Sequence, residues 1–243
     1  MGKEITYKPF GKQAILIEWN AVISEVVLND ILSFKYKIEN QKKQSYTDLI
    51  VGYHSLTIKF KDEIIDFKAT VKELKSIYLS VNFTIKKDNF IWEIPVCYHP
   101  QFGIDLQEIA KKSELSIDEI IELHSKTTYT VYFIGFLPGF LYLGGLEAQL
   151  FFDRKPNPRL QVSKGSVAIG GKQTGIYPSN SAGGWNIIGK TPINFFDVRN
   201  ENPCFAKSGD KIKFTPVSLG EFYQLEQEIE KKNYSISKTL RND

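Results

Sequence analysis

The sequence holds few residues in spacings that support catalysis on their own. Its three histidines, His54, His99 and His124, form no HxH or HExxH pattern, and Cys97 and Cys204 stand far apart and outside any CxxC pair. Zinc sites use such spacings because their ligands must converge on one ion. The sequence therefore predicts no metal site, and it favours two free thiols over a disulfide.

Signatures of a nucleophile and of a nucleotide-binding loop are missing as well. No serine occurs in a G-x-S-x-G elbow, and the run from Gly170 to Lys172 lacks the spacing of a phosphate-binding loop and the helix that should follow it. A chain of this kind is either non-catalytic or one part of a shared active site. We expect no cofactor to be bound by this chain alone.

A glycine-rich aromatic run, G-F-L-P-G-F-L-Y-L-G-G from Gly135 to Gly145, is the first candidate for a binding surface. Glycines at this density allow close approach of backbone or ligand, and the aromatic rings supply apolar surface. The run is either a turn that closes a barrel by aromatic packing or a lip on which a ligand or partner sits. Its candidate residues are Phe136, Pro138, Gly139, Phe140 and Tyr142.

A second candidate block runs from Pro158 to Pro192. Neutral hydrogen-bonding side chains in it could hold a small amide or carboxylate, and the glycine pair before its tryptophan could form a backbone nest for an anion. The alternative is a set of β-turns with one buried tryptophan. The candidate residues are Arg159, Gln173, Thr174, Tyr177, Gly183, Gly184 and Trp185.

The elements that would carry these blocks fall into two halves. Residues 1–100 read as an α+β domain with strands over 14–19, 49–60 and 90–96 and helices after Asn20 and from Ile64, since apolar residues recur there at periods of two and of three to four. This order fits a ferredoxin-like sandwich if the strand over 49–60 breaks in two.

A helical bridge is predicted over residues 101–127, because Asp105 with Glu108 and Ser116 with Glu119 both have the form of a helix start. We interpret His124, near the end of this bridge, as structural.

Residues 128–243 read as an all-β barrel or sandwich, since glycine and proline become frequent and turns recur about every eight to twelve residues. Strands are expected over 131–134, 166–169, 185–188, 193–198 and 211–216, and a last helix after Ser218 to about residue 231.

Charge and hydropathy argue against a nucleic-acid-binding, secreted or membrane protein. The formal charge of +3 is small and unclustered, so no nucleic-acid partner is expected. The N-terminus lacks the apolar core of a signal peptide and no stretch reaches membrane-spanning length. We therefore expect no membrane association and a cytoplasmic location.

Several strings together resemble one protein family. They are L-H-S at Leu123, G-F-L-P-G-F, Y-L-G-G-L, P-R-L, G-S-V, Q-T-G-I-Y-P, G-G-W-N-I-I-G-K-T-P and F-F-D at Phe195. The sequence resembles the family that contains the 5-oxoprolinase B subunit, the Kip inhibitor of a sporulation histidine kinase, and allophanate hydrolase subunit 1. The resemblance implies an α+β N-terminal domain followed by a cyclophilin-like β-barrel.

The same resemblance implies a function. It predicts the B subunit of an ATP-dependent 5-oxoprolinase, which opens 5-oxo-L-proline to L-glutamate together with a stably bound C subunit and a separate A subunit. The chain would be inactive alone, and ATP would be used by the complex. Two alternatives stay open: a Kip-type inhibitor that docks a histidine kinase through residues 136–142, and half of an allophanate hydrolase or urea carboxyltransferase-like complex.

Overall fold

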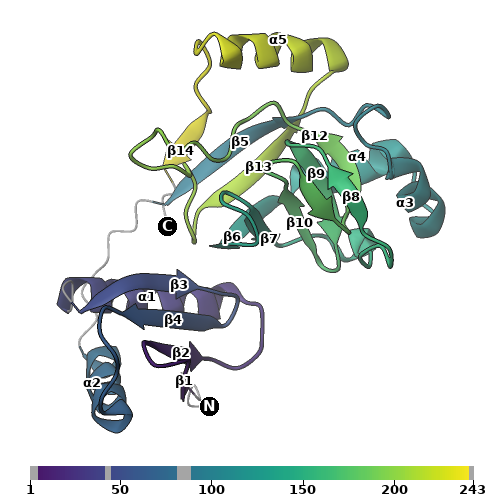
Figure 1. Cartoon of the computed structure of the whole chain (residues 1–243). Helices are drawn as coiled ribbons and strands as arrows, with labels where there is room; N and C mark the ends of the chain where they lie inside the picture. The colour runs from purple at the N-terminus through teal and green to yellow at the C-terminus, as the bar shows by residue number, and fades with distance from the viewer. Residues whose placement is uncertain (1–4, 42–44, 81–88, 241–243) are drawn as a thin grey trace. The chain divides into compact units, whose positions relative to one another are not determined.

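The computed structural model describes residues 5–41, 45–80 and 89–240, and the chain divides into two units, residues 1–87 and 88–243. An antiparallel sheet with the order β1-β2-β4-β3 forms the first unit (Figure 1). Its strands are β1 (Thr6–Pro9), β2 (Ala14–Glu18), β3 (Tyr46–Val51) and β4 (Ser55–Phe60). The alternation that predicts β2 buries Ile15 and Ile17 completely.

Two helices, α1 (Glu25–Gln41) and α2 (Phe67–Leu79), share one core with this sheet. The helix expected directly after Asn20 begins instead at Glu25, where the Ser24 hydroxyl accepts the Val27 N–H at 3.2 Å. Serine caps a helix as well as asparagine does, so the pattern could not choose between the two starts.

Strand pairing is where the first unit differs from expectation. The strand predicted over residues 49–60 does break in two, into β3 and β4, beside Gly52. The strand expected to complete this unit, β5 (Phe90–Val96), belongs instead to the sheet of the second unit, and β1, which the pattern does not predict, takes an edge. Periodicity identifies a strand but not its partner, and contacts divide near residue 88 instead of 100. The ferredoxin-like assignment stays a prediction.

The second unit is built on a mixed sheet of order β12-β9-β10-β7-β6-β13-β5-β14 (Figure 1). Strand β5 runs parallel to β13 (Lys211–Pro216), and the other named pairs are antiparallel. The remaining strands are β6 (Thr128–Ile134), β7 (Leu141–Gly144), β9 (Ser166–Gly170), β10 (Gln173–Ile176), β12 (Asn186–Lys190) and β14 (Lys238–Leu240).

One bridge brings the two sides of this sheet together. The backbones of Cys97, just after β5, and Lys190, at the end of β12, exchange hydrogen bonds of 2.8 and 3.0 Å. The sheet therefore curls until β12, its first strand, meets Cys97, the residue that follows β5. A cyclophilin-like barrel over residues 128–243 stays a prediction, and β5, which shares this sheet, precedes that range.

Helices of the second unit follow the sequence signals closely. They are α3 (Leu106–Ser113), α4 (Ile117–Lys126), the 3₁₀ turn η1 (Ala148–Leu150) and α5 (Leu219–Glu230). Ser116 and Ser218 each form a complete capping box with the glutamate three residues on, as their spacing predicts. Helix α3 begins directly after Asp105, as predicted, but the Asp105 side chain does not cap it, because that carboxylate bonds to Arg159 and to the Ile187 N–H.

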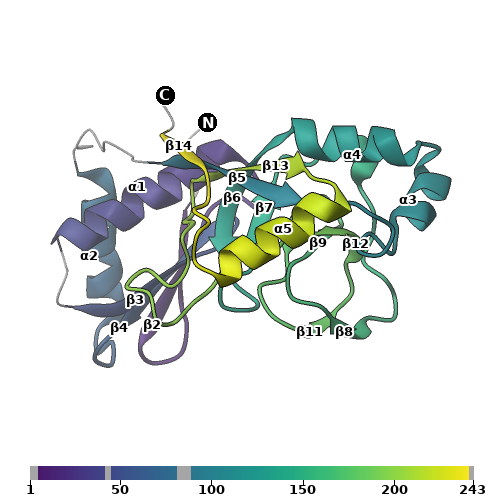
Figure 2. The same cartoon turned by 90° about the horizontal axis from the view of Figure 1, so that it is seen from above.

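A short ribbon of β8 (Arg159–Val162) and β11 (Ser181–Gly183) lies outside the main sheet (Figure 2). The strand expected over residues 193–198 is wrong: the backbone there is irregular, although Ile193 and Phe195 are buried. Side chains that are buried alternately give the same sequence pattern as a β-strand, even where the backbone pairs with no neighbouring strand. Cys97 and Cys204 are free thiols. Within the described ranges no helix is long and apolar enough to cross a membrane.

Candidate functional site

Four of the predicted site residues form one aromatic cluster: Phe140, Tyr142, Tyr177 and Trp185. The Phe140 ring centroid lies 4.9 Å from Tyr142, 5.4 Å from Tyr177 and 5.5 Å from Trp185, with edge-on or tilted planes. Together with Val162, Ala168 and Ile187 these side chains make a small core separate from the main one. The two sequence blocks therefore meet in space, and most of the surface of their aromatic rings is buried against other rings of the cluster.

Glycines are required here because rings lie directly on the backbone. A Cβ at Gly170 would stand 2.5 Å from the Trp185 indole, and one at Gly183 would stand 2.2 Å from the Tyr177 hydroxyl. In a backbone nest, residues with positive φ alternate with residues of helical φ. Neither Gly183 nor Gly184 has a positive φ. The anion-nest interpretation of this pair is therefore not supported, and Gly183 serves close approach instead.

The glycine-rich aromatic run from Gly135 to Gly145 has an exposed part and a buried part. Phe136 is 62% exposed at a φ of 66°, and Pro138 is also exposed, whereas Gly139 and Phe140 are buried. Gly139 has a φ of 84° and its backbone lies against residues 195 and 196, so only glycine fits. An exposed aromatic in left-handed backbone is costly for stability, which is typical of a position used for contact.

Thr174 takes part in a buried relay. Thr174 Oγ1 donates to the Ala168 carbonyl at 3.1 Å, so its oxygen can only accept from His124 Nε2–H, 2.8 Å away. This tautomer leaves Nδ1 of His124 to accept from the Tyr98 hydroxyl at 2.7 Å. Burial lowers the pKa of His124 to about 3, so the ring is neutral. Thr174 accepts a hydrogen bond from the histidine, whereas a nucleophilic hydroxyl donates one to its base, so His124 does not activate the Thr174 hydroxyl. Its side chain is fully buried and bonded, and a ligand cannot reach it in this structure.

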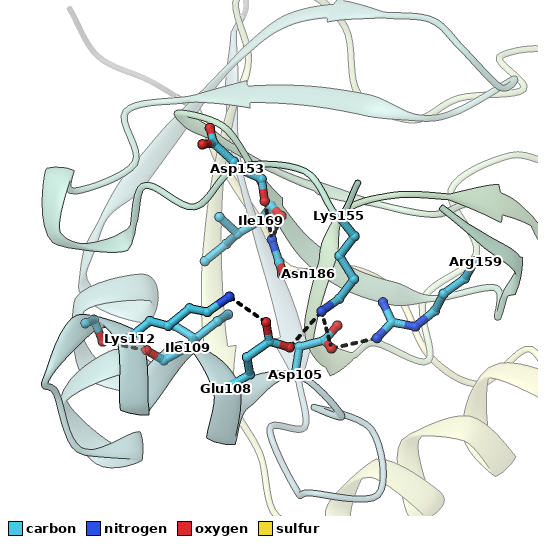
Figure 3. Close-up of polar contacts among 10 residues, drawn as sticks. Asp105, Glu108, Ile109, Lys112, Asp153, Lys155, Arg159, Ile169 and Asn186 are labelled. Atoms are coloured by element: carbon cyan, nitrogen blue, oxygen red, sulfur yellow. Dashed lines mark hydrogen bonds and ion pairs between the residues drawn. The ribbon is translucent and has the colours of Figure 1, made fainter. Parts of the chain in front are cut away.

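A charged cluster of Asp105, Glu108, Lys155 and Arg159 lies at the start of α3 (Figure 3). Asp105 is buried; it accepts the Ile187 N–H at 2.6 Å, Arg159 Nη2 at 2.6 Å and Lys155 Nζ at 3.1 Å. Lys155 also donates to Glu108 at 2.8 Å. Arg159 is one of the predicted site residues, whereas Asp105, Glu108 and Lys155 are not, because their contacts join residues some fifty positions apart.

Two charges of this cluster, those of Glu108 and Lys155, stabilise each other. Hydrogen bonds from Lys112 and Lys155 lower the pKa of Glu108 to about 2. Burial alone lowers the pKa of Lys155, but hydrogen bonds and charges from Glu108 and Asp105 outweigh it and raise the pKa above the usual lysine value. Glu108 and Lys155 therefore both stay ionised over the physiological range, so this pair is suited to holding charge and not to moving protons.

Beside the cluster lies a groove of about 560 Å³, open to solvent. Asn186 forms part of its lining; its amide donates to the carbonyls of Asp153 at 2.9 Å and Ile169 at 3.3 Å. Arg154, also in the lining, lies 5.7 Å from the Trp185 ring centroid, and this contact joins the groove to the aromatic cluster. The Lys155 N–H donates to the Gly184 carbonyl at 2.6 Å, which anchors the same loop.

Comparison with known proteins identifies the family. Residues 5–206 match the family model described as carboxyltransferase domain, subdomain C and D. The chain belongs to this family. Its relatives in the carboxyltransferase C/D family include the 5-oxoprolinase B subunit of Bacillus subtilis, 34% identical over 229 residues, which covers 90% of this chain and 95% of that protein. The B subunit of Haemophilus influenzae is 41% identical over 174 residues, covering 72% and 81%.

Solved structures share the fold of this chain. The crystal structure of TTHA0988 superposes with a TM-score of 0.73 at 30% identity, over 85% of this chain and 40% of that one, so this chain spans less than half of the longer protein. Kluyveromyces lactis urea carboxylase gives a TM-score of 0.82 at 18% identity, over 99% of this chain and 24% of that one. At that identity the likeness shows the fold alone.

Two candidate residues keep a buried donor unpaired. Among the described residues, Arg159 Nη1 and Gln173 Nε2 have no hydrogen-bond partner. Gln173 shares the sheet face of Gly175, whose Cβ position would stand 3.0 Å from Trp185, so it belongs to the aromatic side. No group of three or more histidine, cysteine or acidic residues in the described part of this family member could hold a metal ion.

Proposed function

We propose that this chain is the B subunit of a 5-oxoprolinase, a hydrolase complex that opens the lactam of 5-oxo-L-proline to L-glutamate. The observation that carries the proposal is the 34% identity to the Bacillus subtilis B subunit, which extends over 95% of that protein. Similarity over nearly the whole of both chains supports a shared role better than a motif would.

The chemistry of the chain supports a shared active site. A lactam is a resonance-stabilised amide, so opening it with ATP requires activation of its carbonyl and a water or other nucleophile. The hydroxyl–imidazole contacts among the described residues, those of His124 with Tyr98 and with Thr174, are buried, and Thr174 accepts a hydrogen bond from the ring instead of donating one. We propose that the C and A subunits supply the missing groups, that this chain is inactive alone, and that the complex works in the cytoplasm where ATP is available.

Reconstitution tests this proposal. The chain is co-expressed with the C and A subunit genes of its own genome, and 5-oxoproline-dependent release of phosphate and glutamate is measured. The full set should be active, and each set lacking one of the three chains should be inactive. A full set that hydrolyses no ATP in response to 5-oxoproline would exclude the proposal.

A carboxyltransferase role is the second candidate, favoured by the match of residues 5–206 to the carboxyltransferase domain model. It predicts that a biotin-carrier protein co-purifies with the chain and that the assembled set carboxylates urea. The same purification tests the Kip-type alternative, for which the exposed Phe136 is the supporting feature. Recovery of a histidine kinase without the C and A subunits would favour that alternative.

A further inference from the structure

The groove beside α3 carries one cation that the protein itself leaves available. Arg154 is exposed, and no carboxylate among the described residues pairs with it. Its guanidinium lies 5.7 Å from the Trp185 ring centroid, a cation–π contact that restrains a side chain that would otherwise be mobile. An arginine held in place over an aromatic ring, with its donors free, is prepared to bind a carboxylate.

The other cations of the groove are already engaged. Lys112 and Lys155 donate to opposite oxygens of Glu108 at 2.7 and 2.8 Å, and Lys155 also contacts Asp105. Asp153 adds an exposed negative charge to the lining. The charges other than Arg154 therefore roughly cancel, and Arg154 is the group that selects an anion.

Asn186 supplies a complementary acceptor. It is only 5% exposed, both its amide hydrogens donate to backbone carbonyls, and it contributes to the lining of the groove. With both donors used, its Oδ1 is the group that remains, and no donor among residues 5–41, 45–80 and 89–240 reaches it. A carbonyl oxygen without a partner, on a largely buried side chain at a cavity wall, favours a ligand that brings an N–H.

We propose that this groove binds a small carboxylate-bearing lactam, with the carboxylate on Arg154 and the lactam N–H on the side-chain oxygen of Asn186. Phe151 and Pro156, also in the lining, offer apolar contact to ring methylenes. A volume of about 560 Å³ admits a five-membered ring with water around it. That the lactam is 5-oxoproline rests on the proposed function; that the groove reads a carboxylate and an amide N–H does not.

Binding to the purified full-length chain tests the groove directly. Isothermal titration calorimetry would use 5-oxo-L-proline, pyrrolidin-2-one, which lacks the carboxylate, and L-proline, which lacks the lactam. Arg154→Met should weaken binding of 5-oxo-L-proline about tenfold or more, since a charge-assisted pair is lost. Arg154→Lys should recover part of it, and pyrrolidin-2-one should bind both variants as it binds the wild type.

The matched control is Lys111→Met, which removes one exposed cation of α3 outside the groove and should leave the Kd unchanged. An unchanged Kd in Arg154→Met would overturn the proposal. So would the absence of saturable binding of 5-oxo-L-proline, or equal affinity for L-proline, because the lactam would then not be read.

The reconstituted complex separates this inference from the proposed function. Arg154→Met should raise the KM for 5-oxoproline about tenfold with little change in kcat. An active complex whose KM is unchanged by the substitution would place the substrate elsewhere and leave the proposed function standing. Titration of the chain alone reports on the groove even if the complex proves inactive.

Discussion

The aromatic cluster and the charged groove meet where Arg154 contacts the Trp185 ring, yet they are built on opposite principles. The cluster is rings on glycine backbone, with Trp185 4% exposed and its neighbours touching through edges. The groove is ionised side chains held by one another around Asp105 (Figure 3). Packing sets the geometry of the aromatic cluster, and hydrogen bonds set that of the groove. The family motifs therefore identify the packed scaffold, and the groups proposed to bind a ligand lie next to it.

The largest effect should come from removing the centre of the cluster. Trp185→Ala deletes a buried indole that packs on Gly170, Gly175 and Phe140, and should lower the free energy of unfolding by about 3–5 kcal/mol. Urea unfolding followed by circular dichroism measures this. Trp185→Phe, which keeps an aromatic ring, should cost clearly less, and a loss below about 1 kcal/mol for Trp185→Ala would show that the cluster is not set by packing.

The groove should respond to loss of charge instead of volume. Asp105→Asn keeps the shape of the side chain but leaves Arg159 and Lys155 without their carboxylate, and should cost about 2–3 kcal/mol. Its control is Glu108→Gln, whose ion pairs are at the surface and should contribute less than about 1 kcal/mol. Equal losses in the two variants would mean that burial of Asp105 carries no special weight.

This difference explains how far the sequence predicts the molecule. Capping boxes at Ser116 and Ser218, the split of the strand over 49–60 and the aromatic block are local patterns, and the structure contains all of them. The partner of β5 is not local: Phe90–Val96 pairs with strands more than a hundred positions later.

The same limit applies to the site. Arg159 and Trp185 could be selected because they stand in family-like strings. Asp105 and Lys155 lie outside those strings, and their contacts in the site are with residues 54 and 47 positions away in the sequence. A faint signal existed for the groove in the run D-R-K-P after two phenylalanines, which places three charges beside a proline turn.

Acid should weaken the second unit through the relay behind the cluster. The pKa of His124 is about 3 in the folded state, below its unfolded value of about 6.5, so the unfolded state takes up a proton first as the pH falls. Stability from this group is complete above pH 6.5 and declines toward pH 3. Between pH 6.5 and pH 5 the free energy of unfolding should fall by about 2 kcal/mol.

A pH series of urea unfolding curves measures this decline, and a non-titrating variant isolates it. In His124→Gln the amide can still accept from Tyr98 and donate to Thr174, so the variant should fold but lose most of the slope between pH 6.5 and pH 5. The carboxylates with lowered pKa, such as Glu108, act at lower pH and do not disturb this window. The same slope in both proteins would mean that another group is responsible.

The smallest effect tests the close approach of backbone and ring at the rim of the cluster. Gly183→Ala adds a methyl group 2.2 Å from the Tyr177 hydroxyl and 2.7 Å from two of its ring carbons, and should cost about 1–2 kcal/mol as Tyr177 shifts. Gly220→Ala is the matched control: nothing lies within 4 Å of its Cβ position in α5, so it should stabilise the protein by about 0.5 kcal/mol through helix propensity. A loss of stability in Gly183→Ala together with a gain in Gly220→Ala would show that glycine is required at position 183 because of the contact with the Tyr177 ring. If Gly183→Ala were as well tolerated as Gly220→Ala, the glycine pair before Trp185 would need another explanation, and backbone access for a ligand would again be the leading one.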